Sequence, residues 1–369
     1  MTKERGVLYL VAPPRIGEGL ELLGEWCVAR TGKGGKGKEK EGLKGVEMED
    51  VRRYLEAFYH GMEVKMLDGP GLEFPSDAND EFPLPAPSKT KGKGKPKNPP
   101  AKETKAPKTL WLKTGTSTEL IGIRTRPTPK NPYPHQLNLN DLLDAAIEIL
   151  PDDAYALLML VDHDIYEDDD DDFACGRAYG GSRVAVVSTA RYNPVLDPEV
   201  EGLEREHAWP ASHCGVYVNR CNDAEAEGVA TKKKKQLRDG PVYKALEAHQ
   251  ALPSLDEKPS VKVLEGLWLS RVCRTASHEL GHCLGIDHCV YYACAMQGTA
   301  SLAEDARQPP YLCPVDLAKV LRAMGADENE RYAALERFCV ERKEVKFFAA
   351  FGGWVRCRLE EIQADGGGS

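Results

Sequence analysis

The sequence has no apolar run that approaches the ~20 residues of a membrane-spanning helix. Its first apolar stretch, Val7–Ala12, is too short for the core of a secretion signal and favours a buried strand. The lysine-rich stretches lack interleaved aromatic residues, which argues against nucleic acid as a partner. We therefore expect an intracellular monomer, in the cytoplasm or the nucleus and not secreted, that has no membrane partner.

Disulfide bonds are a second feature that we do not expect. The eleven cysteines are an odd number, and no secretion signal accompanies them. Cysteines that cluster in such a chain favour metal binding over a disulfide framework.

Charge is spread unevenly over the 369 residues. The net charge is −9, but residues 28–45 carry +4 and residues 88–108 carry +7, which leaves −20 for the remainder. The hydrophobic fraction of 41% is enough to bury a core, so the chain as a whole is not disordered. We interpret Lys89–Lys97 as a solvated linker, with nuclear import or binding to an anionic surface as the alternative.

Hydrophobic periodicity places the main elements. It predicts helices over Glu47–His60 and Asn140–Leu150, a buried strand over Tyr155–Val161, and a long helix that Ser260 caps. Phe173–Tyr179 and Ser182–Ala190, separated by two glycines, predict a β-hairpin. The acidic run Asp168–Asp172 is interpreted as a solvated turn, and a calcium site is the alternative, although the run lacks the glycine and glutamate spacing of an EF-hand loop.

These patterns divide the chain into six parts. They are an N-terminal α/β part (1–68), a disordered Lys/Pro-rich insertion (69–108), a sheet and helix (109–198), a polar insertion (199–259), a segment with the long helix, a cysteine-rich subsite and C-terminal helices (260–345), and a tail (346–369).

The long helix carries the motif HExxHxxGxxH. His278 and His282 are four residues apart, so both imidazoles leave the same helix face and can bind one zinc ion. Glu279 can lean over the metal without coordinating it. Gly285 can adopt a left-handed conformation that ends the helix, so that His288 returns as the third ligand. Three protein ligands leave a position open for water, which is typical of a catalytic zinc.

This site predicts peptide hydrolysis by a metal-activated water, with Glu279 as the general base. The alternative is a non-catalytic, zinc-stabilised interaction module whose basic insertions recruit an anionic partner. Glu279 and the open coordination position favour the enzyme, because a scaffold needs neither. A peptide substrate would pair as an added strand along Phe173–Tyr179, which makes Phe173, Ala174 and Gly176 candidate substrate-binding residues.

Three cysteines follow the helix closely. Cys289, Cys294 and Cys313 suggest a second zinc bound by thiolates, with simple packing of buried cysteines as the alternative.

The segment from His278 to Cys313 resembles the archaemetzincin signature, HExxHxxGxxHC, four residues, CxM, a spacer and CxxC. The matching residues are His278, Glu279, His282, Gly285, His288, Cys289, Cys294, Met296 and Cys313. The resemblance implies a metzincin-like zincin fold of the α/β (α+β) class, with a mixed sheet, an antiparallel edge strand and a catalytic helix under the cleft. It also implies aminopeptidase-like cleavage of small peptides, Met296 as the Met-turn residue beneath the histidines, and a structural zinc held by four cysteines.

The chain departs from the signature at Asp316, where the pattern has a cysteine. Asp316 can itself ligate zinc through a carboxylate oxygen. Another thiol, Cys339 or Cys357, can supply the fourth bond instead. In the third interpretation the metal is held weakly and Asp316 serves the start of a helix that Cys313 caps.

Overall fold

The computed structural model describes residues 4–30, 43–69, 71–79, 107–115, 119–129, 131–212 and 240–366. The predicted linker Lys89–Lys97 and residues 213–239 of the polar insertion lie outside this part, so the predictions made for them stay untested.

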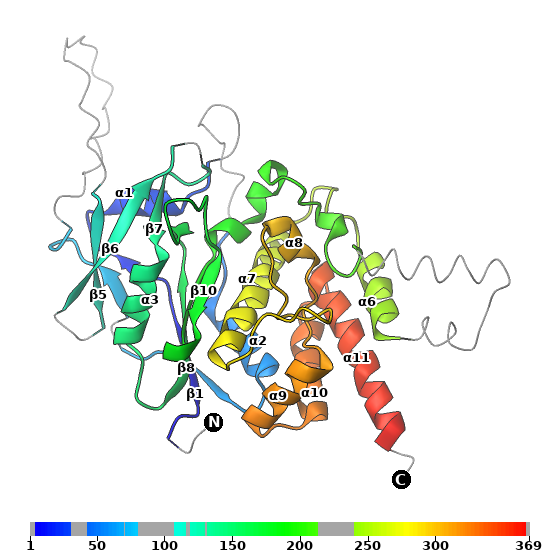
Figure 1. Ribbon diagram of the computed structural model, residues 1–369. Coiled ribbons are helices and arrows are strands. Elements are labelled where there is room, and N and C mark those ends of the chain that lie inside the picture. The colour runs from blue at the N-terminus through cyan, green and yellow to red at the C-terminus, as the bar shows by residue number, and fades with distance from the viewer. Residues whose placement is uncertain are drawn as a thin grey trace.

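A five-stranded mixed sheet lies at the centre of the molecule (Figure 1). Its order is β10-β11-β8-β1-β3. The strands are β1 (Val7–Val11), β3 (Glu63–Met66), β8 (Ala154–Val161), β10 (Gly176–Tyr179) and β11 (Val184–Ser188). All of them run parallel except β10, which pairs antiparallel with β11 at the edge. The predicted mixed sheet with one antiparallel edge strand is therefore confirmed.

The sheet is buried on both faces, which explains the unbroken apolar sequence of β8. Leu158 and Leu160 belong to the core that contains α2 (Met48–Phe58) and α7 (Val261–Cys283). Leu157 and Met159 belong to the opposite core, which contains α3 (Leu139–Glu148). Alternate residues of one strand thus anchor two separate layers of helices.

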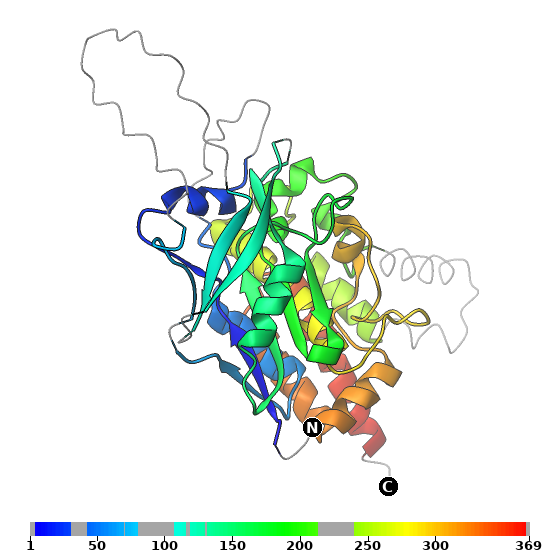
Figure 2. The ribbon, with the colours of Figure 1, turned by 60° about the vertical axis from the view of Figure 1, so that its left-hand side comes forward.

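A second sheet packs beyond α3 and has the order β2-β4-β5-β6-β7-β9 (Figure 2). Its strands are β2 (Arg15–Ile16), β4 (Leu72–Phe74), β5 (Thr109–Thr114), β6 (Leu120–Pro127), β7 (His135–Asn138) and β9 (Ile165–Tyr166). The prediction of disorder from residue 69 onward is wrong for β4. Leu72 and Phe74 point into the core on alternate positions, and three residues are too few for this alternation to show as a pattern.

The C-terminal half is helical. Its helices are α6 (Pro241–Gln250), α7, α8 (Leu302–Arg307), α9 (Pro314–Met324), α10 (Glu328–Val340) and α11 (Lys346–Gly366), and a short α1 (Glu21–Gly24) lies near the N-terminus. Short 3-10 turns span Glu25–Cys27, Gly180–Ser182, Ala190–Tyr192, Pro194–Glu199 and Arg205–His207.

Two of these helices correct the predicted boundaries. The last part of the polar insertion 199–259 forms α6, and the predicted tail 346–369 forms α11, which lies beside α6 and α10 (Figure 1). Ala245 of α6 and Phe348 and Phe351 of α11 are fully buried in the same core as α7. Exposed charged residues such as Glu247 of α6 and Arg356 and Glu360 of α11 interrupt the apolar stripe in the sequence. None of the described helices combines the length and the apolar character that a membrane crossing requires.

Candidate active site

Helix α7 carries the candidate active site at its C-terminal end. The Ser260 hydroxyl accepts a hydrogen bond from the Val263 amide and caps the first turn, as predicted. The second half of the helix is buried beneath the central sheet, where Trp268 Nε1 donates to the Thr189 carbonyl. This packing fixes the position of the last turns, which face the edge strand β10 (Figure 1).

Gly285 ends the helix as predicted. Its φ angle is +75°, in the left-handed region that favours glycine. The Ile286 amide then donates to the Gly281 carbonyl at 3.1 Å, which closes the turn. The reversed chain brings His288 back to the helix face that carries His278 and His282.

The three histidines converge. Each contributes one ring nitrogen, and these three nitrogens lie within 4.8 Å of one another. His278 Nε2 and His282 Nε2 are 3.1 Å apart. The opposite nitrogens are held by backbone carbonyls, since His278 Nδ1 contacts Ala295 O and His282 Nδ1 contacts Ile286 O, both at 2.7 Å. Donation from Nδ1 leaves the Nε2 lone pairs free to face a common point.

Burial favours the neutral form of two of these imidazoles. Burial, together with the neighbouring His282 and His288, lowers the pKa of His278 to about 4. Burial also lowers the pKa of His282. Neutral imidazole is the form that binds a metal ion, and three ring nitrogens on one side of a cleft fit a zinc site with a free position.

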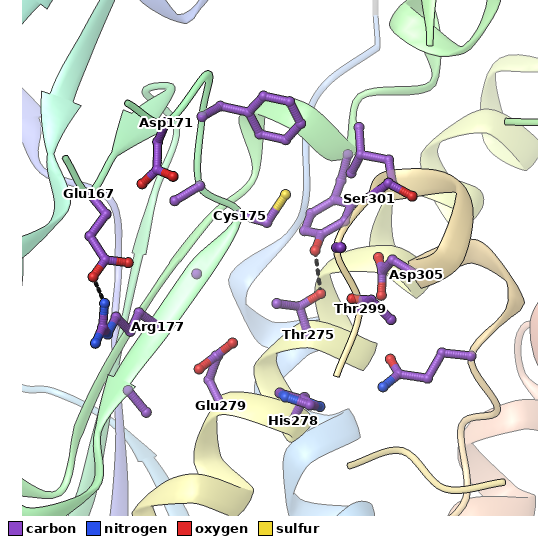
Figure 3. Close-up of a pocket in the computed structure, with 18 of the residues that line it drawn as sticks. Glu167, Asp171, Cys175, Arg177, Thr275, His278, Glu279, Thr299, Ser301 and Asp305 are labelled. Atoms are coloured by element: carbon purple, nitrogen blue, oxygen red, sulfur yellow. Dashed lines mark hydrogen bonds and ion pairs between the residues drawn. The ribbon is translucent and has the colours of Figure 1, made fainter. Parts of the chain in front are cut away.

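Glu279 points into a cavity beside the histidines (Figure 3). Glu279 is only 8% exposed to solvent. Within the described part of the chain, its carboxylate has no hydrogen-bond or ion-pair partner. Burial raises its pKa to about 8, Arg177 opposes this rise, and Asp305 adds to it. A carboxyl group with this pKa can both accept and return a proton near neutral pH.

Met296 is fully buried against α7. A Cβ atom at Gly281, one residue before His282, would collide with the Met296 sulfur. The Cys289 amide donates to the Met296 carbonyl at 2.7 Å, which ties this residue to the chain just after His288. Met296 thus lies against the helix turn that joins two of the histidines.

A cavity of about 810 Å³ lies between β10 and α7. The predicted substrate-binding residues Phe173, Ala174 and Gly176 all line it. A Cβ atom at Gly176 would lie 3.4 Å from Glu279 Cγ, so the edge strand runs close to the candidate base. Because β10 ends the central sheet among the described strands, its outer edge is available to an extended peptide.

Sequence reasoning missed several residues of this cavity. They are Glu167, Arg177, Tyr192, Thr275, Thr299, Ser301, Asp305 and Gln308, together with the acidic residues Asp170, Asp171 and Asp172. Arg177 lies within the predicted edge strand Phe173–Tyr179, and this position was the usable signal for it. No sequence pattern indicated that Asp305 lines the cavity, because this residue lies on the short helix α8, outside the histidine motif.

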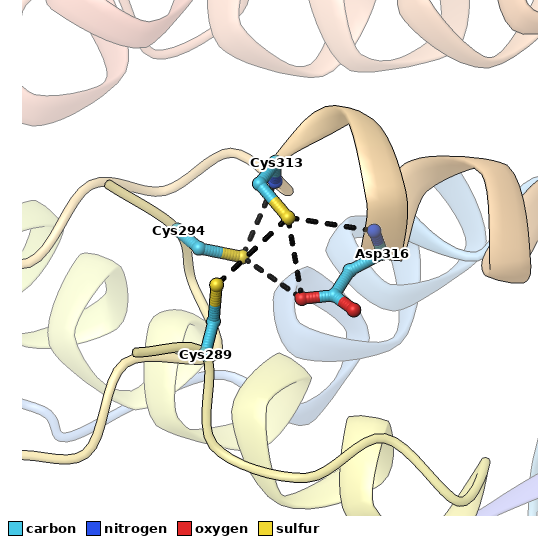
Figure 4. A group of neighbouring side chains, drawn as sticks. All are labelled: Cys289, Cys294, Cys313 and Asp316. Carbon is cyan, nitrogen blue, oxygen red and sulfur yellow. Dashed lines mark hydrogen bonds between the residues drawn. The ribbon is translucent and has the colours of Figure 1, made fainter. Parts of the chain in front are cut away.

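A second group lies beside the first. Cys289, Cys294, Cys313 and Asp316 each offer one ligand atom, and these atoms lie within 4.8 Å of one another (Figure 4). Asp316 Oδ2 is 3.4 Å from Sγ of both Cys294 and Cys313, and the Sγ atoms of Cys289 and Cys313 are 3.9 Å apart. Burial raises the pKa of Cys294 and of Cys313.

Asp316 is the fourth member of this group. Neither Cys339 nor Cys357 belongs to it. The predicted helix start is also present, because the Cys313 sulfur accepts a hydrogen bond from the Asp316 amide at 3.4 Å and Pro314 is the first residue of α9. The two roles are compatible, since the amide serves the cap and the carboxylate faces the sulfurs.

Fold and site together define a class of protein, in which a long helix under a mixed α/β sheet presents a histidine triad and a glutamate to a cleft. Residues 249–322 match the model of Peptidase family M54. The matched segment contains the three histidines, Glu279 and the whole second group. The resemblance to the archaemetzincins is thereby confirmed.

Several curated proteins with similar sequences are named archaemetzincins. Archaemetzincin-2 of Pongo abelii is 27% identical over 209 residues, which is 57% of this chain and 48% of that protein. Archaemetzincin-2 of Mus musculus is 30% identical over 51% of this chain and 42% of that protein. Archaemetzincin-1 of Mus musculus is 30% identical over 54% of this chain and 33% of that protein. The chain spans less than half the length of these relatives.

Solved structures superpose on the chain only loosely. The archaemetzincin of Methanopyrus kandleri covers 88% of this chain and 98% of its own, with 16% identity and a TM-score of 0.38. A zinc-dependent peptidase of Methanocorpusculum labreanum covers 85% of this chain and 99% of its own, with 15% identity and a TM-score of 0.36.

Proposed function

We propose that the chain is a zinc-dependent metallopeptidase that cleaves small peptides, with Glu279 as the general base. One observation carries the proposal. Three histidine nitrogens converge within 4.8 Å at the floor of a cavity into which Glu279 points, beside the open edge of β10. The match of residues 249–322 to a peptidase family supports the same conclusion.

His278, His282 and His288 would hold the catalytic ion. When bound, zinc supplies a polarised water whose pKa falls toward ~7. Glu279 accepts the proton of that water and later donates it to the amine of the departing product. Its burial and the absence of a competing partner among the described residues suit this role, because the carboxylate can turn toward the substrate.

The edge strand β10 would position the substrate. A peptide that pairs with its outer edge brings a backbone carbonyl close to Glu279, because a Cβ atom at Gly176 of the strand would lie only 3.4 Å from Glu279 Cγ. Phe173, Ala174 and Gly176 would contact the peptide. The resemblance to the archaemetzincins supports aminopeptidase-like trimming of small peptides.

We also assign a second, structural zinc to Cys289, Cys294, Cys313 and Asp316. Four ligand atoms within 4.8 Å suit a closed tetrahedral site. The site joins the loop after His288 to the start of α9. It thereby stabilises the position of His288, which directly precedes the ligand Cys289.

The Glu279→Gln variant tests the function. We expect hydrolysis of a peptide library to fall by at least ~100-fold, because the base contributes on the order of 10²–10⁴ in rate. The zinc content, measured by elemental mass spectrometry, should stay at the wild-type value, since Glu279 is not a proposed ligand. The Glu265→Gln variant is the matched control, because Glu265 lies on the same helix outside the cavity.

Two outcomes would contradict the proposal. Equal hydrolysis by wild type and Glu279→Gln would exclude Glu279 as the base. Zinc binding by a wild type that cleaves no member of the library would favour the non-catalytic, zinc-stabilised interaction module instead.

A further inference from the structure

One end of the cavity is strongly acidic. Glu167, Asp170, Asp171 and Asp172, called here the acidic wall, line it just before the edge strand. With Glu279 and Asp305, the cavity is lined by six carboxylates and a single guanidinium, that of Arg177. Figure 3 shows Glu167 and Asp171 on the β10 side of the cavity and Asp305 on the opposite side.

Only part of this charge is neutralised within the protein. Glu167 forms an ion pair with Arg177, and Asp305 forms one with Arg274 at 3.1 Å. In the described part of the chain, no ion pair reaches Asp170, Asp171 or Asp172. Asp171 Oδ2 accepts only a long hydrogen bond of 3.3 Å from the Asp168 amide.

The loop that carries the acidic wall directs its side chains outward and its backbone carbonyls toward the protein. Arg126 donates hydrogen bonds to Asp168 O at 3.0 Å and also to Asp171 O. Gln136 Nε2 donates to Asp172 O at 2.8 Å. Because the carbonyls are held by Arg126 and Gln136, the carboxylates of Asp170 and Asp172 remain exposed at the cavity rim.

These carboxylates do not form a metal chelate. Two groups of potential metal ligands occur in the ranges that the structure covers, and neither includes a residue of Asp168–Asp172. The acidic wall is therefore an open surface rather than a folded cation site. A second feature points to a ligand here, since the carboxylate of Glu279 is more than nine-tenths buried, has no partner among the described residues and points into the same cavity.

We infer that the acidic wall makes the cleft select peptides that carry a positively charged amine or guanidinium close to the bond that is cut. This inference rests on the proposed peptidase function and names its substrate class. The charge can come from a lysine or arginine side chain or from a free N-terminal amine, since both present the same cationic chemistry. The carboxylates of Asp170, Asp171 and Asp172, which form no ion pair with the residues that the structure covers, attract such a group and disfavour an acidic one.

The test compares matched peptides on the zinc-loaded chain. Each peptide carries lysine, norleucine or glutamate at one position next to the cleaved bond, and each is made with a free and with an acetylated N-terminus. Norleucine keeps the length of lysine without its charge. We expect lysine to exceed norleucine by about tenfold in kcat/KM, glutamate to be the poorest, and high salt to reduce the difference.

The Asp170→Asn/Asp172→Asn double variant removes two charges from the acidic wall. These residues are chosen because their side chains accept no hydrogen bond from the described residues, whereas that of Asp171 holds the loop. We expect the lysine-to-norleucine ratio to fall by about tenfold. The Asp152→Asn/Asp169→Asn variant loses the same charge outside the cavity and should keep the wild-type ratio.

The outcomes separate the two proposals. Preference for lysine with either N-terminus identifies a side chain as the selected charge, and loss of cleavage on acetylation identifies the N-terminal amine. Cleavage that ignores both changes, or a ratio that the double variant leaves unchanged, overturns the inference while the peptidase function stands. Binding of the same labelled peptides, followed by fluorescence anisotropy, decides the charge preference even when no peptide is cleaved.

Discussion

Asp316 determines how tightly its cluster with Cys289, Cys294 and Cys313 can hold a metal ion. A carboxylate oxygen is a harder donor than the thiolate that stands at this position of the signature, so it holds zinc less tightly. Lys319 Nζ lies 3.0 Å from Asp316 Oδ1 and draws on the same carboxylate. The second zinc should therefore be more easily lost than one bound by four thiolates.

Substitutions at Asp316 test this directly. We expect Asp316→Cys to hold the second zinc at least ~10-fold more tightly than wild type, and Asp316→Asn to release it first during titration with a chelator. Asp287→Asn is the control, because Asp287 is exposed and belongs to neither ligand group. Equal chelator resistance of wild type and Asp316→Asn would show that the carboxylate is no ligand.

His163 gives the fold a sensitivity to acid. Burial lowers its pKa to about 4, and its Nε2 has no hydrogen-bond partner among the described residues. The unfolded chain takes up a proton at this position below pH ~6.5, whereas the folded chain does not. Stability is therefore full above pH ~6.5 and falls as the pH drops toward 4. The loss between pH 7 and 5 is about 2 kcal/mol.

The His163→Asn variant should lose about 2 kcal/mol less than wild type over the same pH interval, because asparagine does not titrate. Urea unfolding at pH 7 and at pH 5 measures the difference. Identical losses in both proteins would mean that other groups cause the acid sensitivity.

At the scale of elements, the sequence predicted the helices and strands that carry a long hydrophobic pattern or a clear cap. The unbroken apolar run of β8, the stripe of α2 and the capped α7 all formed where expected. Strand β7 was missed because two of its three buried residues are polar. Gln136 and Asn138 lie fully inside, where Asp164 and Arg124 satisfy their side chains, and no hydrophobicity pattern records such pairs.

The glycine turn after β10 sets the distance between the edge strand and α7. A Cβ atom at Gly180 would lie 2.7 Å from the His282 carbonyl oxygen, whereas one at Gly181 would meet nothing within 4 Å. Gly180→Ala must therefore push the edge strand away from a proposed zinc ligand. We expect a loss of about 1–3 kcal/mol in unfolding free energy, together with weaker zinc binding.

Gly181→Ala is the matched control and should change stability by less than about 1 kcal/mol. Urea unfolding and zinc competition on the two variants give both quantities. Equal behaviour of the two glycines would contradict the close packing of this turn on α7.

At the scale of the whole molecule, distant parts of the chain meet at the active site. The sequence located the candidate metal ligands, because they follow one contiguous motif. It could not place the acidic wall or Asp305 beside the histidines, because the fold brings these residues together from separate segments of the chain. The net charge of −9 likewise concealed a cavity whose lining is acidic.

Helix α11 shows why the last part of the chain cannot be an independent tail. Its Trp354 ring stacks on Tyr311 with centroids 4.3 Å apart. The Tyr311 carbonyl accepts a hydrogen bond from the Ala295 amide at 2.7 Å, and the Ala295 carbonyl in turn contacts His278 Nδ1. The C-terminal helix is thus connected to the first histidine of the triad by three successive contacts.

Truncation after Val345 tests this role. It removes six large buried apolar side chains, those of Phe347, Phe348, Phe351, Trp354, Val355 and Leu359. Burial of this set contributes on the order of 10 kcal/mol, which is comparable to the whole stability of a domain. We expect the truncated chain to lose its cooperative thermal transition and its histidine-bound zinc, as measured by calorimetry and metal analysis. Truncation after Ala364 leaves these side chains in place and should preserve both. A cooperative, zinc-loaded protein that ends at Val345 would show that the core around α7 is complete without α11.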